Sequence, residues 1–95
     1  MVSSRLPPTS ALKAFVVTAQ SGSFTQAARD LNLTQSAVSQ AVRSLEEQLG
    51  TPLFVRGVGR VELTAAGRSY RDAVAPALDR IATAPPRFGR SFQQP

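Results

Sequence analysis

The sequence predicts a mainly α-helical domain with a three-helix core, a small β-hairpin and a fourth helix. Two observations carry this prediction. Apolar residues recur at helical spacing in four successive segments, which is typical of helices that bury one face. Two short strand-like runs flank a Gly-Val-Gly triplet between the third and fourth segments, as expected for a hairpin. With 95 residues, the chain has room for one small core.

The first helix is expected directly after the pair of prolines that ends at Pro8. Thr9 or Ser10 can cap its start, and Gly22 can adopt the left-handed conformation just past its end. One apolar stripe runs along this segment and consists of Leu12, Phe15, Val16 and Ala19. The stripe predicts a helix that packs one face on the core.

The second helix is short and begins with a capping box. Ser23 and Gln26 have the spacing at which each side chain bonds the backbone N–H of the other residue. The apolar stripe of this helix is Phe24, Ala27, Ala28 and Leu31. Because the alanine side chains are small, another helix can approach closely, and we expect the helix to close at Asn32.

Residues 32–34 form a tight turn before a third, longer helix. Leu33 is expected to point inward and Thr34 to cap the third helix, which Gly50 ends and Pro52 prevents from continuing. The apolar seam of this helix is Val38, Val42, Leu45 and Leu49. Its other face is polar and carries Gln35, Ser36, Ser39, Gln40 and Arg43. The two helices and their turn together predict a helix-turn-helix.

The hairpin is expected from residues 53–56 and 60–63, with residues 57–59 at its turn. Thr64 can cap a fourth helix. The apolar residues of that helix have the spacing of a short coiled-coil seam, and they are Tyr70, Val74, Ala77 and Ile81. Pro76 is expected to bend the helix or weaken it locally.

The composition argues against several classes of function. The chain contains neither cysteine nor histidine, which excludes disulfides, thiolate or imidazole metal ligands, cysteine nucleophiles and histidine acid–base catalysis. Glu46 and Glu47 are adjacent and should point about 100° apart on a helix, as solvated charges rather than a catalytic pair. We therefore expect no enzyme activity, no metal site and no cofactor.

The net charge of the chain is +5, which favours a polyanionic partner. Residues 1–63 carry six basic and four acidic side chains, and residues 64–95 carry five basic and two acidic ones. More than half of the excess therefore lies outside the helix-turn-helix. The charge supports nucleic-acid binding but does not establish it.

The polar face of the third helix suits a DNA major groove, which is about 12 Å wide and exposes hydrogen-bonding base edges. The amides of Gln35 and Gln40 can pair with adenine N6 and N7. Ser36 and Ser39 can serve a base or a phosphate, and Arg43, further along the helix, is expected to meet the DNA backbone.

Phosphates can also bind where the second and third helices begin, because free N–H groups lie there. The hydroxyls of Ser23, Thr25 and Thr34 would add to these sites. From the residues alone, an ordinary solvated helix face stays open as an alternative, and Arg43 could instead pair with Glu47 one turn on.

The residues themselves resemble a known family. The segment SFTQAARDLNLTQSAVSQAVRSLEEQLGTPLFVR and the later LTAAGR are similar to the N-terminal DNA-binding domain of LysR-type transcriptional regulators. The likeness runs from about Leu6 to Ala82. Positions in register include Ser23-Phe24-Thr25, Thr34-Gln35-Ser36, Pro52-Leu53-Phe54 and Ala66-Gly67.

This resemblance implies a winged helix-turn-helix, with a recognition helix at about 35–49 in the major groove and a wing at about 53–63 near the minor groove. The residues that it implies for base contact are Gln35, Ser36, Ser39 and Gln40. It also implies that Arg56 and Arg60 face the DNA backbone or minor groove. The fourth helix would be the family's linker helix, which pairs with its twin in a dimer.

The sequence departs from the family pattern at three points. Gln40 stands where the family very often has arginine, which favours adenine over guanine there. Gly59 and Glu62 stand where wings of this family usually carry basic side chains, so we expect this wing to bind DNA less tightly. The sequence has no segment that resembles the two-lobed effector-binding domain of the family, so we expect either an excised domain or a naturally short protein.

We therefore expect a DNA-binding domain at residues 1–63, a linker or dimerisation helix at 64–83 and a tail or truncated linker at 84–95. The expected partner is double-stranded DNA with a pseudo-palindromic operator, bound by a homodimer that forms through the fourth helix. No membrane segment, no secretory signal and no small-molecule effector site are expected, and the expected location is the cytoplasm. The alternative is a short interaction module that forms heterodimers with full-length relatives.

Overall fold

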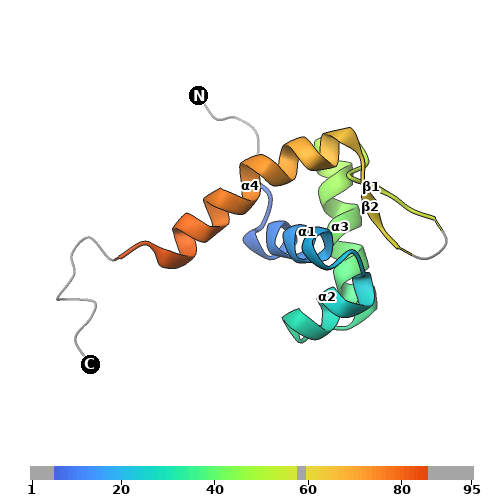
Figure 1. The fold of residues 1–95 in the computed structure, drawn as a ribbon, viewed down its shortest axis with the longest axis horizontal. Coiled ribbons are helices and arrows are strands. Elements are labelled where there is room, and N and C mark those ends of the chain that lie inside the picture. The colour runs from blue at the N-terminus through green and yellow to red at the C-terminus, as the bar shows by residue number, and fades with distance from the viewer. Residues whose placement is uncertain (1–5, 58–59, 86–95) are drawn as a thin grey trace.

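The computed structural model describes residues 6–57 and 60–85. Its elements in chain order are α1 (Thr9–Ser21), α2 (Phe24–Leu31), α3 (Gln35–Leu49), β1 (Phe54–Val55), β2 (Glu62–Leu63) and α4 (Ala65–Thr83). The first three helices pack together, the hairpin extends to one side, and α4 crosses over the core and projects to the other side (Figure 1). The expected mainly α fold with a small hairpin wing is confirmed.

Local capping sets the bounds of the helix-turn-helix as expected. The Ser23 Oγ accepts a hydrogen bond from the N–H three residues on at 3.1 Å, and the Thr34 Oγ1 does the same at 3.0 Å. Asn32 ends α2 and Gly50 ends α3, with φ angles of 60° and 75° in the left-handed region. Each bond satisfies a backbone donor that has no partner within its helix.

The capping box at Ser23 is only half formed, which corrects the sequence prediction. The Ser23 N–H donates to the Ser21 Oγ at 3.3 Å, and the Gln26 Nε2 donates to the Asp30 Oδ1 at 2.9 Å. Because a neighbouring hydroxyl already satisfies the Ser23 N–H, the Gln26 side chain bonds along its own helix. The predicted cap at Thr9 or Ser10 is also wrong, since α1 starts after Pro8 with no side-chain cap.

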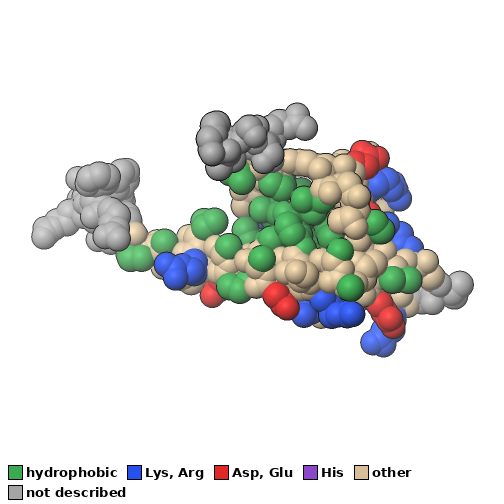
Figure 2. Space-filling view, turned by 90° about the horizontal axis from the view of Figure 1, so that it is seen from above, with side chains coloured by type: hydrophobic (Ala, Val, Ile, Leu, Met, Phe, Trp, Pro, Cys, Tyr) green, Lys and Arg blue, Asp and Glu red, His purple; other side chains and the backbone are tan. Residues whose placement is uncertain are grey.

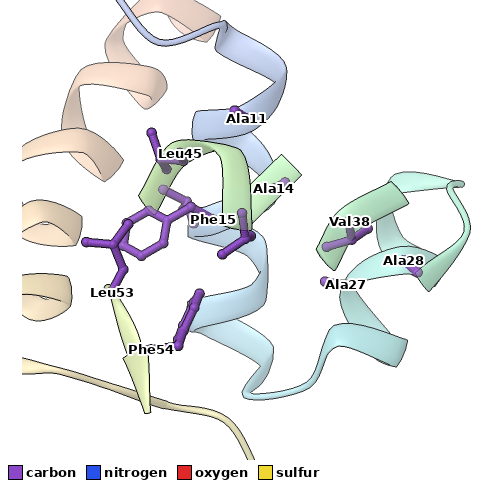
Figure 3. Packing of buried hydrophobic residues seen from close by; sticks show 11 residues of the cluster. Ala11, Ala14, Phe15, Ala27, Ala28, Val38, Leu45, Leu53 and Phe54 are labelled. Atoms are coloured by element: carbon purple, nitrogen blue, oxygen red, sulfur yellow. The ribbon is translucent and has the colours of Figure 1, made fainter. Parts of the chain in front are cut away.

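The core lies where α1, α2, α3 and the wing base meet (Figure 3). Phe15 of α1 is fully buried, with its ring centroid 5.5 Å from that of Phe54 and 5.7 Å from that of Tyr70. Ala27 and Ala28 are buried at the contact of α2 with its neighbours. Leu33 is 51% exposed, so the inward orientation expected for it is wrong: the turn places its side chain on the surface.

The wing is joined tightly to the start of α4. The two strands pair antiparallel, with Phe54 opposite Leu63, and are shorter than the runs in the sequence. The Thr64 Oγ1 accepts from the Gly67 N–H and donates to the Pro52 carbonyl, each at 2.9 Å. A Cβ on Gly67 would lie 2.0 Å from the Leu53 carbonyl oxygen, so only glycine permits this approach.

Candidate nucleic-acid interface

The polar face of α3 forms a single surface feature. One hollow of about 290 Å³ is lined by Gln35, Ser36, Ser39, Gln40 and Arg43. Ser39 is half-buried and the other four side chains are exposed. On the opposite side of the helix, Val38, Val42 and Leu45 are buried in the core. The structure thus brings together all five polar residues that the sequence predicts for this face of α3.

Arg43 also lines this hollow, and no carboxylate of the described residues forms an ion pair with it. The two ion pairs among residues 6–57 and 60–85 join Arg56 to Glu46 and Arg71 to Asp72. The alternative pairing of Arg43 with Glu47 is therefore absent from this part of the chain. The guanidinium is open to a partner outside the chain.

The three predicted hydroxyls lie at the starts of α2 and α3, where the cap of each helix accepts from one of the backbone N–H groups that have no partner within the helix. Ser23 and Thr34 act as N-caps, and their oxygens accept from the backbone. Thr25 differs, because its hydroxyl donates to the Gln35 Oε1 at 3.1 Å. A contact between the two helices thus orients one of the predicted base-reading amides.

The wing arginine Arg56 makes a structural contact that the sequence did not predict. Its NH1 lies 3.0 Å from the Glu46 Oε1, and its guanidinium lies over the Phe24 ring at 5.6 Å from the centroid. Its side chain is still 37% exposed. Arg56 therefore holds the wing against α2 and α3 while part of its side chain faces solvent.

Another correction to the sequence prediction concerns Glu46. It was expected to be a solvated charge, but it is 9% exposed, and its Oε2 accepts from the N–H groups of Leu53 and Phe54 at 2.8 and 3.2 Å. Together with the Arg56 contact, these bonds satisfy a buried carboxylate. A signal existed: Val38, Val42 and Glu46 stand at i, i+4 and i+8, so Glu46 continues the apolar seam.

Arg60 lies on the turn side of the paired strands of the wing and is exposed. It lines a hollow of about 320 Å³ together with Gln20, Ser21 and Arg68. Glu62, one of the departures from the family pattern, borders the same hollow. The other wing departure, Gly59, lies outside the described residues.

The four residues predicted for dimerisation are not equivalent. Tyr70 and Val74 are half-buried and pack on the core of their own chain, and burial raises the pKa of the Tyr70 hydroxyl. Ala77 is exposed, and Ile81 is 69% exposed. α4 is continuous through Pro76, and the bend expected there stays a prediction.

A groove of about 580 Å³ lies between α1 and the outer half of α4. Its walls are largely apolar and include Val16, Ala75, Leu78 and Ile81, with Lys13 and Asp79 also on the lining. Seen from above, hydrophobic side chains gather beside α4, and most of the basic side chains lie toward the wing end (Figure 2). The apolar and the basic surfaces of this view are therefore largely separate.

Within the described ranges, no group of three or more acidic, cysteine or histidine residues is placed to hold a metal ion. Among the same residues, every helix is too short or too polar to cross a bilayer.

Comparisons with known proteins agree with this arrangement. The family model for bacterial regulatory helix-turn-helix proteins of the lysR family matches residues 9–68. The HTH-type transcriptional activator AmpR of Citrobacter freundii is 46% identical over 87 residues, which is 92% of this chain and 30% of that protein. The glycine cleavage system transcriptional activator of Escherichia coli K12 is 48% identical over 69 residues, 73% of this chain and 23% of its own length. The chain thus spans less than a third of these relatives.

Solved structures give the same result. The crystal structure of a BenM_DBD/catB site 1 DNA complex has a TM-score of 0.76 and 31% identity, over 79% of this chain and 83% of that one. Oxidised OxyR of Corynebacterium glutamicum has a TM-score of 0.80 and 32% identity, over 83% of this chain and 26% of that one. Nothing in these matches supports the alternative of a short heterodimerising module. The chain therefore belongs to the lysR family of bacterial regulatory helix-turn-helix proteins.

Proposed function

We propose that this chain is the DNA-binding part of a bacterial transcription regulator and reads double-stranded DNA with the polar face of α3. The observation that carries the proposal is the hollow lined by five polar side chains of α3, opposite its buried seam. The amides of Gln35 and Gln40 and the hydroxyls of Ser36 and Ser39 supply donors and acceptors for base edges in a major groove. The DNA complex of the similar BenM_DBD chain supports this role.

The wing and the helix starts would supply contacts to the DNA backbone. Arg43, Arg60 and the exposed part of Arg56 offer positive charge, and the capping hydroxyls of Ser23 and Thr34 keep their O–H groups for phosphates. We assign residues 1–63 to DNA binding and residues 64–83 to the linker helix. Residues 86–95 of the expected tail lie outside the described residues.

A homodimer through α4 would place two recognition helices on a pseudo-palindromic operator. Ala77 and Ile81 remain exposed for such a contact, and the apolar groove between α1 and α4 adjoins Ile81. Because Tyr70 and Val74 already pack on their own core, the seam left for a partner is short. We expect a weak dimer that the two DNA half-sites stabilise. A monomer in sedimentation at high concentration, both free and on DNA, would refute it.

We further propose that the chain has no enzymatic activity and acts in the cytoplasm. The relatives at the sequence level are named as transcription regulators, which supports this proposal.

Selection of bound duplexes from random DNA tests the proposed function. We expect enrichment of a two-fold related sequence with adenine where Gln40 meets the groove, bound in the nanomolar range. The affinity should fall steeply as salt rises, because Lys and Arg contacts release counterions. An unenriched pool, or binding that does not respond to salt, would contradict the proposal.

A further inference from the structure

Thr25 and Gln35 belong to different helices and meet at the edge of the polar face. Thr25 is the second residue of α2, and Gln35 is the first residue of α3. The Thr25 hydroxyl donates to the Gln35 Oε1 at 3.1 Å, and both side chains are exposed. The side chain of the neighbouring Gln26 instead bonds Asp30 and Arg29 within α2. The contact therefore links the amide on α3 to the helix before the turn.

The hydroxyl of Thr25 is used differently from the capping hydroxyls beside it. A hydroxyl has one proton to donate and two lone pairs that accept. Ser23 and Thr34 accept from backbone N–H groups, so each keeps its proton for another acceptor. Thr25 gives its proton to Gln35. Since phosphate oxygens only accept, a Thr25 hydroxyl bonded in this way cannot donate to a phosphate.

The contact also limits the position of the Gln35 amide. The amide oxygen has two lone pairs and the amide nitrogen has two N–H groups. Thr25 occupies one lone pair, so one acceptor position and both donors remain. Adenine requires one acceptor for N6 and one donor for N7. A reversed amide would instead donate from its NH₂ to the Thr25 oxygen, so the hydroxyl can hold the amide in either orientation, and one acceptor and one donor remain for adenine in both cases.

We propose that Thr25 is a positioning residue that sets base selectivity through Gln35 rather than by touching the DNA backbone. This inference rests on the proposed function, because it assumes that α3 faces a base edge. A glutamine held before binding loses less side-chain freedom when it pairs with a base. The hydroxyl then acts on the single base pair that Gln35 meets.

The test is a double-mutant cycle on the duplex that the wild-type chain selects from random DNA. Thr25→Val removes the hydroxyl and keeps the shape, Thr25→Ser keeps the hydroxyl, and Gln35→Ala removes the amide. We expect Thr25→Val to weaken binding roughly 3- to 10-fold, and Thr25→Ser to bind like the wild type. In the Gln35→Ala background, Thr25→Val should have no further effect.

The duplexes that Thr25→Val selects from random DNA should show no base preference at one position and the wild-type preference at the others. An equal loss in both backgrounds, or a uniform loss on all duplexes, would overturn the proposal in favour of a phosphate contact. Unchanged affinity of Thr25→Val would overturn it as well. Urea unfolding midpoints equal to that of the wild type would exclude misfolding of Thr25→Val. Thr25→Ala is a second variant that lacks the hydroxyl. If the wild type itself prefers no duplex, the proposed function fails, which is a separate outcome.

Discussion

The two ends of α3 use polar side chains in opposite ways. Near the start of the helix, Gln35 and Gln40 are exposed and line an open hollow. Near its end, Glu46 is buried and its oxygens accept from two backbone N–H groups and one guanidinium. The first end is suited to bind an outside partner, and the second fixes the wing to the helix. Changes at the start should therefore affect DNA binding, and changes near the end should affect stability.

The largest expected effect is at the joint between the wing and α4. Gly67→Ala would place a Cβ 2.0 Å from the Leu53 carbonyl oxygen and 2.9 Å from the Leu63 Cδ2. Because a backbone atom cannot move aside without shifting the wing, we expect the free energy of unfolding to fall by about 3 kcal/mol. Urea unfolding measures this loss, and Ser69→Ala on the exposed face of the same helix is the control. Equal stability of the two variants would show that the wing can shift freely.

Glu46→Ala should have the next largest effect. It leaves the N–H groups of Leu53 and Phe54 without their carboxylate acceptor and frees Arg56, so we expect a loss of about 2–3 kcal/mol. Glu47→Ala is a matched control, because Glu47 is exposed and should change stability by less than about 0.5 kcal/mol. Similar losses for the two glutamates in chemical denaturation would remove the contrast between the ends of α3.

Gln40→Ala tests the opposite end. We expect a binding loss of about 1–3 kcal/mol on the selected duplex and a weaker preference for adenine at one position. The unfolding free energy should stay within about 0.5 kcal/mol of the wild type, because the side chain is exposed. Fluorescence anisotropy measures the loss of binding, and urea unfolding measures the free energy of unfolding. A stability loss as large as that of Glu46→Ala would show that the two ends do not differ.

Thr18→Val should have the smallest effect, and it should raise the free energy of unfolding rather than lower it. Thr18 is fully buried in α1, and its Oγ1 has no hydrogen-bond partner among the described residues, whereas the buried Glu46 is fully paired. Thr18→Val replaces this hydroxyl with a methyl group of similar size, so we expect a gain of about 0.5–1 kcal/mol. A calorimetric melting temperature below that of the wild type would mean that the hydroxyl does have a partner, such as a buried water.

Local rules predicted most of the helix-turn-helix. The caps at Ser23 and Thr34 and the helix ends at Asn32 and Gly50 depend on neighbours a few positions away, and the structure has them as expected. The polar face of α3 follows from helical periodicity alone. Its five residues share one hollow.

The features that the sequence did not predict depend on contacts between segments that are separated along the chain. Glu46 is buried because residues 52–54 fold back along α3 and present their N–H groups to it. Tyr70 was expected to face a second chain, but its ring packs on Phe15, which lies far away in sequence. Thr25 contacts Gln35 only because the turn brings the starts of two helices together. Helical periodicity describes the faces of one helix at a time, so it does not predict these contacts between elements.

The central claim is that the start of α3 reads DNA, and two serines on that helix test it most directly. Ser39 lines the hollow, and Ser44 lies outside it on the same helix. The measurement is the ratio of affinities for the selected duplex and for a scrambled duplex at one salt concentration. We predict that Ser39→Ala lowers this ratio roughly 5- to 100-fold and that Ser44→Ala leaves it unchanged. An equal ratio for both variants and the wild type would contradict the assignment of this face as the DNA-reading surface.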